Sequence, residues 1–523
     1  MGTAAPPLEP VAFSQVWTDA VAARPDGLFL CFERSDGRVA EWTYGTFDGE
    51  VARVAATLHR LGVGPGDTVH LALTNSPSFI ATWLACTRLG AAMVPSDPQG
   101  RAPELAAHIA RTRPVVGVCA VSGAEEYGRG VAESGHDVAV VAVDPDDVDL
   151  VAFDGSEFAD WPEVAPTDRA AVMFTSGTTG RPKGVEVTQA NYAFTGAVMA
   201  RRSGLRSHHR QIVVLPLFHA NAQYYSFAPA ITVGASVALM SGFSASGFVT
   251  QCARHGATHA SLFAAPLRMI LARGSAPVDG VVLENCWYAQ NVTTDQYEAI
   301  ADLFGCAPRQ LYGMTETVPA VLTEPAADPV PESMGMVTPG CELEVHDAEG
   351  RPVPDGEVGE IVVGGHPGTT LFAGYLDDPE TTAASYRDGW FRTGDRAVRR
   401  PDGRHVFDGR RSDVLKVAGE NVSIVEVESV IAAHPGVLEA AVVGRPDEVR
   451  DEVPVAFVVA RDPENPPTSD ELARWAEARL AKSKRPRSFT LLEELPRTSV
   501  GKIRKFLLAD PEAESTPTPE TSR

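Results

Sequence analysis

A run of small and hydroxylated residues followed by a lysine, FTSGTTGRPKG, occupies residues 174–184. A buried strand is expected just before it, at 170–174, and strand and helix patterns resume after it. Gly177, Gly180 and Gly184 allow backbone conformations that gather N–H groups around an anion. The side chains that add further donors are Thr175, Ser176, Thr178, Thr179 and Lys183. The segment therefore predicts a loop that holds a polyphosphate.

Two other interpretations of this loop are less consistent with its sequence. The spacing G-x-x-x-x-G-K-[ST] is absent, so the loop is not of the Walker A type. A flexible surface linker is the remaining alternative, because Gly and Ser are common in linkers. Such linkers seldom lie between a buried strand and a Pro-Lys-Gly turn, which favours phosphate binding.

Four further motifs follow the loop along the chain. They are LYGMTET at 311–317, DGWFRTGD at 388–395, DGRRSDVLKVAGENVSIVEVE at 408–428 and LPRTSVGKIRK at 495–505. Taken singly, each has an ordinary explanation as a turn or as solvated surface. Taken in this order, the five motifs resemble the adenylate-forming superfamily of acyl-CoA and aryl-CoA synthetases, peptide-synthetase adenylation domains and luciferases. The resemblance covers residues 12 to 508 and is closest to crotonobetaine/carnitine-CoA ligase-like members.

The resemblance implies how the chain binds ATP. It implies that the loop wraps the β- and γ-phosphates, that Tyr312 stacks on adenine and that Thr315 contacts the α-phosphate. Glu316 is implied to bind Mg²⁺, a hard cation that prefers carboxylate and phosphate oxygens. Asp395 is implied to accept the ribose hydroxyls, and Arg410 to contact ribose and phosphate.

Lys502 resembles the mobile catalytic lysine of this superfamily. Attack of a carboxylate on the α-phosphate brings two anions together, so a bridging cation stabilises the transition state. Ser412 stands at the hinge position, where relatives usually have Asp or Lys. The resemblance implies that the C-terminal domain rotates after adenylation and brings the loop around Gly419 to a pantetheine tunnel. Free CoA is the expected acceptor, because no carrier-protein domain is recognised.

The acid-binding pocket is implied to lie near PLFHANAQYY at 216–225, CWYAQNVT at 286–293 and the adenine motif. Its expected members are Phe218, His219, Asn221, Gln223, Trp287, Tyr288, Gln290, Asn291 and Met314. His219 is expected to act in catalysis by gating the carboxylate, with a buried structural histidine as the alternative. Bulky and polar residues at 287–291 favour a small polar or aromatic acid over a fatty chain. Structural packing of the aromatic pair is the alternative explanation.

Three functions fit these motifs to different degrees. The first is an acid–thiol ligase that forms acyl-AMP with release of pyrophosphate and then transfers the acyl group to CoA. The second is an ATP-dependent diazotase, which would adenylate nitrite in a small polar pocket and let an aromatic amine attack it. The third is a non-catalytic nucleotide-binding protein, which the presence of both Lys502 and Glu316 disfavours.

The elements that must position these residues follow an α/β pattern. At 523 residues and 44% hydrophobic content, the chain exceeds one core. We predict a large N-terminal domain at 1–410, with two α/β subdomains and a β-barrel-like subdomain. A small mobile α+β domain is predicted at 411–510, with helices capped by Ser423 and Ser469, and a disordered tail at 511–523.

Composition limits the partners of the chain. There are 45 basic and 68 acidic residues, a net charge of −23, which disfavours nucleic acid and anionic membranes as partners. The seven scattered cysteines are expected to be buried thiols. No run of about 20 apolar residues and no signal-peptide pattern is found, which predicts a soluble cytoplasmic protein. Nothing in the sequence indicates the oligomeric state.

Overall fold

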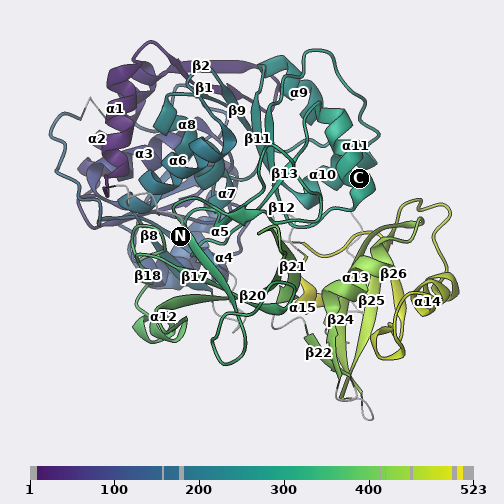
Figure 1. Cartoon of the computed structure of the whole chain (residues 1–523). Helices are drawn as coiled ribbons and strands as arrows, with labels where there is room; N and C mark the ends of the chain where they lie inside the picture. The colour runs from purple at the N-terminus through teal and green to yellow at the C-terminus, as the bar shows by residue number, and fades with distance from the viewer. Residues whose placement is uncertain are drawn as a thin grey trace. The chain divides into compact units, whose positions relative to one another are not determined.

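The computed structural model describes residues 9–155, 158–175, 182–410, 414–417, 420–447, 451–497 and 503–509. The chain divides into two compact units, one of residues 1–343 and 363–391 and one of 344–362 and 392–523. Helices and sheets are mixed in both units, which confirms the predicted α/β fold class (Figure 1). The expected boundary near residue 410 stays a prediction, because the units divide the chain differently.

The largest sheet of the first unit has the strand order β15-β14-β13-β12-β11-β9-β10-β1-β2. Its strands are β1 (Leu28–Glu33), β2 (Val39–Thr43), β9 (Arg210–Val213), β10 (Ser236–Met240), β11 (His259–Phe263), β12 (Asn285–Ala289), β13 (Arg309–Tyr312), β14 (Leu322–Thr323) and β15 (Met336–Val337). Pairing is parallel from β1 through β13 and antiparallel at both ends. The adenine motif, LYGMTET at 311–317, therefore begins in β13, the last strand of the parallel run.

A second sheet of the same unit has the order β18-β8-β7-β4-β3-β5-β6. Its strands are β3 (Thr68–Ala72), β4 (Ala92–Pro95), β5 (Val116–Ala120), β6 (Ala139–Val143), β7 (Arg169–Thr175), β8 (Lys183–Thr188) and β18 (Gly374–Tyr375). The antiparallel pairs β7–β8 and β8–β18 close one side of an otherwise parallel sheet. This side carries both ends of the predicted phosphate loop.

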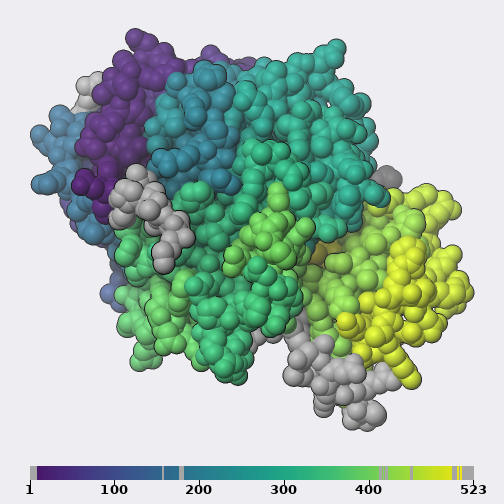
Figure 2. All heavy atoms as spheres, in the orientation of Figure 1, coloured from purple at the N-terminus to yellow at the C-terminus, as the bar shows by residue number. Residues whose placement is uncertain are grey.

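Helices cover the two sheets and pack on one another. They are α1 (Phe13–Ala23), α2 (Tyr44–Arg60), α3 (Pro77–Leu89), α4 (Ala102–Thr112), α5 (Ala124–Ser134), α6 (Gln189–Ser203), α7 (Ala220–Ala222), the π-helical turn η2 (Gln223–Phe227), α8 (Ala228–Val233), α9 (Phe248–His255), α10 (Ala264–Ala272), α11 (Thr294–Phe304) and α12 (Pro379–Ala384). Figure 2 shows the purple N-terminal segment beside the blue segment that holds α6 and α8, and α1 contacts both helices.

Local sequence sets the two ends of α6. Thr188 caps its first turn by accepting a hydrogen bond from the N–H of Asn191, whose side chain bonds back to the N–H of Thr188. Gly204 ends the helix with a left-handed φ of 73°, a conformation that favours glycine. The helix thus begins and ends where residue type dictates.

Five strands between residues 342 and 410 form a third sheet. Its strands are β16 (Glu342–His346), β17 (Val358–Gly364), β19 (Tyr386–Arg387), β20 (Trp390–Arg399) and β21 (His405–Arg410). The order is β16-β17-β20-β19, and β21 pairs with β20. The β19–β20 and β20–β21 pairs are antiparallel, as the sequence predicts.

The C-terminal part of the second unit is a sheet with helices. Its elements are β22 (Val414–Val417), β23 (Glu420–Ser423), α13 (Ile424–Ala432), β24 (Val437–Asp447), β25 (Asp451–Ala460), α14 (Ser469–Glu477), β26 (Phe489–Leu492) and α15 (Lys505–Ala509). Apolar residues of α13, α14 and the strands form a core of their own, including Val427, Val458 and Leu472. This agrees with the α+β unit expected from the sequence.

The helix caps of this unit include one correction. Ser423 caps α13 as expected, since its side chain accepts from the N–H of Glu426. Ser469 is wrong as the cap of α14, because Thr468 holds that position. The side chains of Thr468 and Glu471 accept hydrogen bonds from each other's backbone N–H groups, which is a capping box. Ser469 cannot form such a box, because no glutamate lies three residues after it.

All seven cysteines are free thiols; five are buried, while Cys306 and Cys341 are half-buried. This broadly confirms the expectation of structural thiols. No helix within the described ranges is long and apolar enough to cross a membrane.

Replacing Thr468 with Ala should destabilise the start of α14, because the cap side chain and its reciprocal bond are lost. The expected cost is about 1 kcal/mol, which raises the hydrogen-exchange rate of the first-turn amides about fivefold. Ser469→Ala is the matched control and should leave those rates unchanged. Equal acceleration in both variants would contradict the assignment of Thr468 as the cap.

Candidate functional site

The two ends of the predicted phosphate loop are neighbours in the second sheet. Thr175 ends β7, Lys183 begins β8, and the two residues are register partners. The ammonium of Lys183 lies 4.6 Å from the ring centroid of Tyr375, within cation–π range. The loop residues predicted between them lie outside the described ranges: Ser176, Gly177, Thr178, Thr179 and Gly180.

Glu316 is a buried carboxylate, 4% exposed, beside this pair of strand ends. The hydroxyl of Tyr375 donates a hydrogen bond to Glu316 Oε1 at 3.0 Å. The N–H of Phe372 donates to the backbone carbonyl of Glu316, also at 3.0 Å. Burial and the nearby carboxylate raise the pKa of Tyr375 above its ordinary value, so the phenol stays a donor.

Tyr375, which sequence reasoning missed, contacts two predicted site residues, Glu316 and Lys183. It is 59 residues from Glu316 along the chain, and it reaches that side chain because β18 pairs with β8. Its segment, LFAGYLDD at 371–378, lies outside the five motifs. The pairing of a two-residue strand leaves no periodic signal that local patterns could reveal.

The adenine motif forms a fixed turn at the end of β13. Tyr312 is buried at the strand end, and Met314 and Thr315 in the turn are half-buried. The N–H of Met314 donates to the Thr317 hydroxyl at 2.9 Å. Tyr224 from η2 donates to the carbonyl of Thr315 at 3.5 Å, which links this turn to the first predicted pocket segment, residues 216–225.

Asp395 and Arg410 form an ion pair in the second unit. They are register partners on β20 and β21, and Arg410 Nε donates to Asp395 Oδ1 at 2.7 Å. Asp395 is 4% exposed, and its N–H donates to the Thr393 hydroxyl. The two residues implied to contact ribose are therefore held together by adjacent strands.

Part of the predicted acid pocket contains polar atoms without hydrogen-bond partners among the described residues. These atoms are Nε2 of His219, both amide atoms of Asn221 and Nε1 of Trp287. Asn221 lies in α7, which contacts β11, and β11 pairs with the strand that carries Trp287. Ser261, the register partner of Trp287, also has an unpartnered hydroxyl, and it was missed because a serine within an apolar strand carries no motif.

Burial of the His219 side chain favours its neutral form. Its ring packs on Phe218 with centroids 4.4 Å apart. Burial lowers the pKa of His219 to about 4, although the nearby Asp97 carboxylate opposes this shift. The imidazole is therefore neutral at physiological pH and can donate or accept one hydrogen bond at each nitrogen.

The aromatic pair in the second pocket segment divides between two faces of its sheet. Trp287 is on the face of Ser261, with the guanidinium of Arg309 4.1 Å from its ring centroid. Tyr288 belongs to the hydrophobic core on the other face, and its hydroxyl donates to the carbonyl of Pro331. Alternation along a strand places the two rings on opposite sides.

Three other predicted pocket residues have different surroundings. Gln223 is fully buried, with its amide donating to the carbonyl of Leu217 and accepting from the hydroxyl of Tyr192. Gln290 is exposed and has a φ of 73°. Asn291 is exposed and accepts a hydrogen bond from Gln310. Their roles in substrate binding stay predictions, and within the described residues neither of the last two bonds to the side chain of Asn221 or Trp287.

Several predicted residues of the C-terminal region lie outside the described ranges. They are Ser412, Gly419 and Lys502. Their roles stay predictions.

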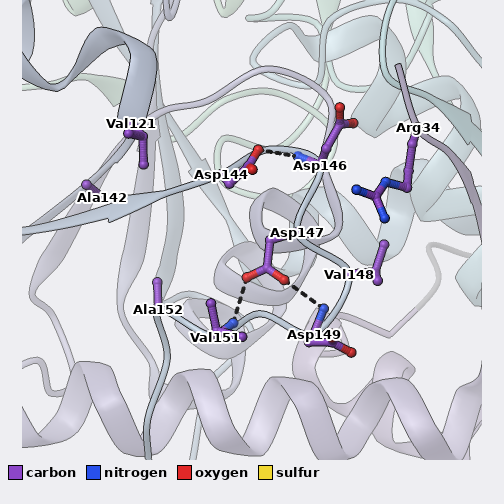
Figure 3. Close-up of a pocket in the computed structure, with 10 residues that line it drawn as sticks. All are labelled: Arg34, Val121, Ala142, Asp144, Asp146, Asp147, Val148, Asp149, Val151 and Ala152. Atoms are coloured by element: carbon purple, nitrogen blue, oxygen red, sulfur yellow. Dashed lines mark hydrogen bonds between the residues drawn. The ribbon is translucent and has the colours of Figure 1, made fainter. Parts of the chain in front are cut away.

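A separate hollow of about 580 Å³ lies near β6 and contains none of the predicted site residues (Figure 3). Its aspartates bond to backbone N–H groups: Asp144 to that of Asp146, and Asp147 to those of Asp149 and Val151. These carboxylates therefore stabilise the loop that carries them.

Comparison with known proteins gives a consistent result. The profile of the AMP-binding enzyme family matches residues 17–376, and that of the AMP-binding enzyme C-terminal domain matches 426–502. A crotonobetaine/carnitine–CoA ligase from Salmonella paratyphi C is 33% identical over 506 residues, which is 94% of this chain and 97% of the relative.

Solved structures agree in fold. ATP-bound MatB from Rhodopseudomonas palustris is 25% identical with a TM-score of 0.85, covering 96% of this chain and 99% of that one. A benzoate CoA ligase from Burkholderia xenovorans LB400 is 25% identical with a TM-score of 0.86, covering 96% and 100%.

Replacing His219 with Gln should reduce the loss of stability in acid. The native imidazole has a pKa of about 4 while the ordinary value is 6.5, so the unfolded chain binds more protons between these values. Stability therefore falls as pH falls through this window, on the order of 1.4 kcal/mol for each unit of pKa difference. The melting temperature of His219→Gln should decline less steeply than that of the wild type.

The exposed His208 offers the matched control, since His208→Gln removes an imidazole that is not enclosed. Its melting temperature should follow the wild-type slope. Parallel slopes for wild type and His219→Gln would show that His219 is not held neutral by the fold.

Proposed function

The chain belongs to the AMP-binding enzyme family and is an AMP-forming acyl-CoA ligase, and we propose that its acid substrate is small and polar or aromatic. The observation that carries this proposal is the group of unpartnered buried atoms on His219, Asn221, Ser261 and Trp287. Each such atom costs about 1–3 kcal/mol when it stays unpaired, so a substrate that bonds to them is favoured over a hydrocarbon chain.

The names of the relatives are compatible with this substrate class. Crotonobetaine and carnitine, in the name of the Salmonella ligase, are small polar acids, and benzoate is a small aromatic one. The indole of Trp287 and the rings of Phe218 and His219 provide flat apolar surfaces as well as polar atoms. Both the polar and the aromatic alternative are therefore retained for this chain.

ATP and Mg²⁺ fit the residues that the first unit provides. Lys183 supplies a cation at the end of the phosphate loop, and Glu316 supplies one buried carboxylate beside it. Within the described ranges, no group of three or more His, Cys, Asp or Glu residues could hold a metal ion. This suits Mg²⁺, which is usually bound by one or two carboxylates together with substrate phosphates.

The proposed reaction has two steps. A carboxylate oxygen of the acid attacks the α-phosphorus of ATP, the bond to the bridging oxygen breaks, and pyrophosphate leaves with its electrons. The thiol sulfur of CoA then attacks the acyl carbon, AMP leaves with the carboxylate oxygen, and the thiol proton passes to solvent. Lys502 is proposed to stabilise the first transition state, and Tyr312, Thr315, Asp395 and Arg410 to hold the nucleotide.

The acceptor is CoA, and the loop around Gly419 is proposed to line its path. The alternative, a diazotase that adenylates nitrite, gains no support from the Salmonella and Burkholderia relatives, which are CoA ligases. ATP and CoA are cytoplasmic metabolites, which supports the proposed cytoplasmic location.

A screen of pyrophosphate release across acids, each with and without CoA, tests the substrate class. Crotonobetaine, carnitine, short dicarboxylic acids, benzoates, fatty acids and nitrite form the panel. We expect release with a small polar or aromatic acid and no release with fatty acids. Asn221→Leu should reduce kcat/KM for the best polar acid by about tenfold, because one hydrogen-bonding side chain is lost.

Two results would contradict the proposal. Fatty acids as the best substrates would overturn the assignment of a polar pocket. AMP formation that requires nitrite and an aminobenzoate but not CoA would replace the ligase with the diazotase.

Replacing Lys502 with Ala should abolish acyl-adenylate formation while ATP binding persists, because the lysine acts in the transition state. Single-turnover formation of the adenylate measures the first effect, and calorimetric titration with ATP measures the second. Lys482→Ala, at another lysine of the C-terminal region, is the control and should retain adenylation. Unchanged adenylation in Lys502→Ala would remove this lysine from the mechanism.

A further inference from the structure

Arg111 in the last turn of α4 contacts three segments of the site from behind. Its guanidinium donates hydrogen bonds to the carbonyls of Pro182 and Leu376, the latter at 3.2 Å. The same group lies 5.2 Å from the ring centroid of Phe174. These three contacts come from the ends of β7, β8 and β18, which are adjacent in the second sheet although β18 is far from the other two in the sequence.

Each contact of Arg111 adjoins one residue of the candidate site. Phe174 precedes Thr175, Pro182 precedes Lys183, and Leu376 follows Tyr375. Lys183 and Tyr375 contact each other, and Tyr375 donates to Glu316. A displacement of any of these backbone segments would therefore move a group that faces the triphosphate.

Neighbouring residues of α4 strengthen the same support. The ring of His108, one helical turn before Arg111, stacks on Phe174 with centroids 4.0 Å apart and planes 5° apart. His108 Nδ1 also bonds to the Ser96 hydroxyl at 2.8 Å. Phe174 is thus held by two side chains of one helix, and Arg111 also links this helix to the residues that flank β8 and β18.

We propose that Arg111 is a positioning residue for the triphosphate of ATP. It fixes the ends of β7, β8 and β18 so that Thr175, Lys183 and Tyr375 are preorganised around Glu316. The planar guanidinium suits this function, because its rigid donors reach two carbonyls at once, whereas a lysine ammonium is a single point charge. The inference rests on the proposed binding of ATP at this site.

The test compares ATP with AMP, because only ATP carries the β- and γ-phosphates. Titration calorimetry in the presence of Mg²⁺ is carried out on the full chain for wild type, Arg111→Gln and Arg111→Lys. Arg111→Gln should weaken ATP about tenfold while AMP affinity changes less than about twofold, since the site loses its support near the outer phosphates. Arg111→Lys should fall between wild type and Arg111→Gln.

Arg24 provides a matched control elsewhere in the same unit. It is also half-buried, and its guanidinium donates to two backbone carbonyls, those of Ser207 at 2.6 Å and Gly234 at 2.9 Å. Arg24→Gln removes an equivalent pair of hydrogen bonds without touching the strand ends of the site. It should leave the ratio of ATP to AMP affinity at the wild-type value.

The outcomes separate this inference from the proposed function. Equal weakening of ATP and AMP in Arg111→Gln, or no weakening of either, would overturn the positioning role. The same loss of ATP selectivity in Arg24→Gln would also overturn it, because the effect would then reflect general destabilisation. Absence of ATP binding in the wild type would instead contradict the proposed function. If Arg111→Gln does not fold, Arg111→Lys alone decides, by whether ATP is weakened more than AMP.

Discussion

The buried carboxylate of Glu316 is the constraint on which the first unit's site depends. A carboxylate that is 4% exposed loses most of its hydration, and such a group is stable only when the fold supplies donors. The hydroxyl of Tyr375 is one donor, and it is available only because β18 pairs antiparallel with β8. The same pairing brings Lys183 over the Tyr375 ring. One hydrogen bond thus joins the adenine motif to the end of the phosphate loop.

The chemistry of the acid pocket follows from how side chains alternate on the largest sheet. On one face, Ala260, Leu262, Cys286 and Tyr288 join an apolar core with α9, α10 and α11. On the other face, Ser261 and Trp287 are register partners with unpartnered polar atoms. The same strands that stabilise the fold on one side therefore offer hydrogen-bonding groups on the other.

The sequence allowed the fold class, the phosphate-loop strand ends and the cap at Ser423 to be predicted because each depends on short-range patterns. Residues whose contacts depend on pairing between segments distant in the sequence were not predicted. Tyr375 lies in β18 and Arg111 bonds to the residue after it, and β18 is a strand of two residues with no periodicity of its own. Thr468 rather than Ser469 caps α14 because Glu471 lies three residues after Thr468 and completes a capping box. The residue type at the cap position alone does not reveal this difference. Among the predicted pocket residues, Tyr288 and Trp287 are neighbours in one motif. The motif does not indicate that their side chains lie on opposite faces of the sheet.

The net charge of −23 makes local arrangement more important than overall attraction. The long-range field of such a chain opposes the approach of a polyanion, and salt screens that field within about 10 Å. Binding of a triphosphate must therefore come from short-range donors whose positions are fixed before the ligand arrives. Lys183, whose ammonium lies over the Tyr375 ring, is a cation held in this way, and Arg111 bonds to the carbonyls of Pro182 and Leu376, the residues next to Lys183 and Tyr375. Because the fold has already oriented these groups, little further ordering of side chains is needed on binding, and an acidic protein can hold an acidic ligand.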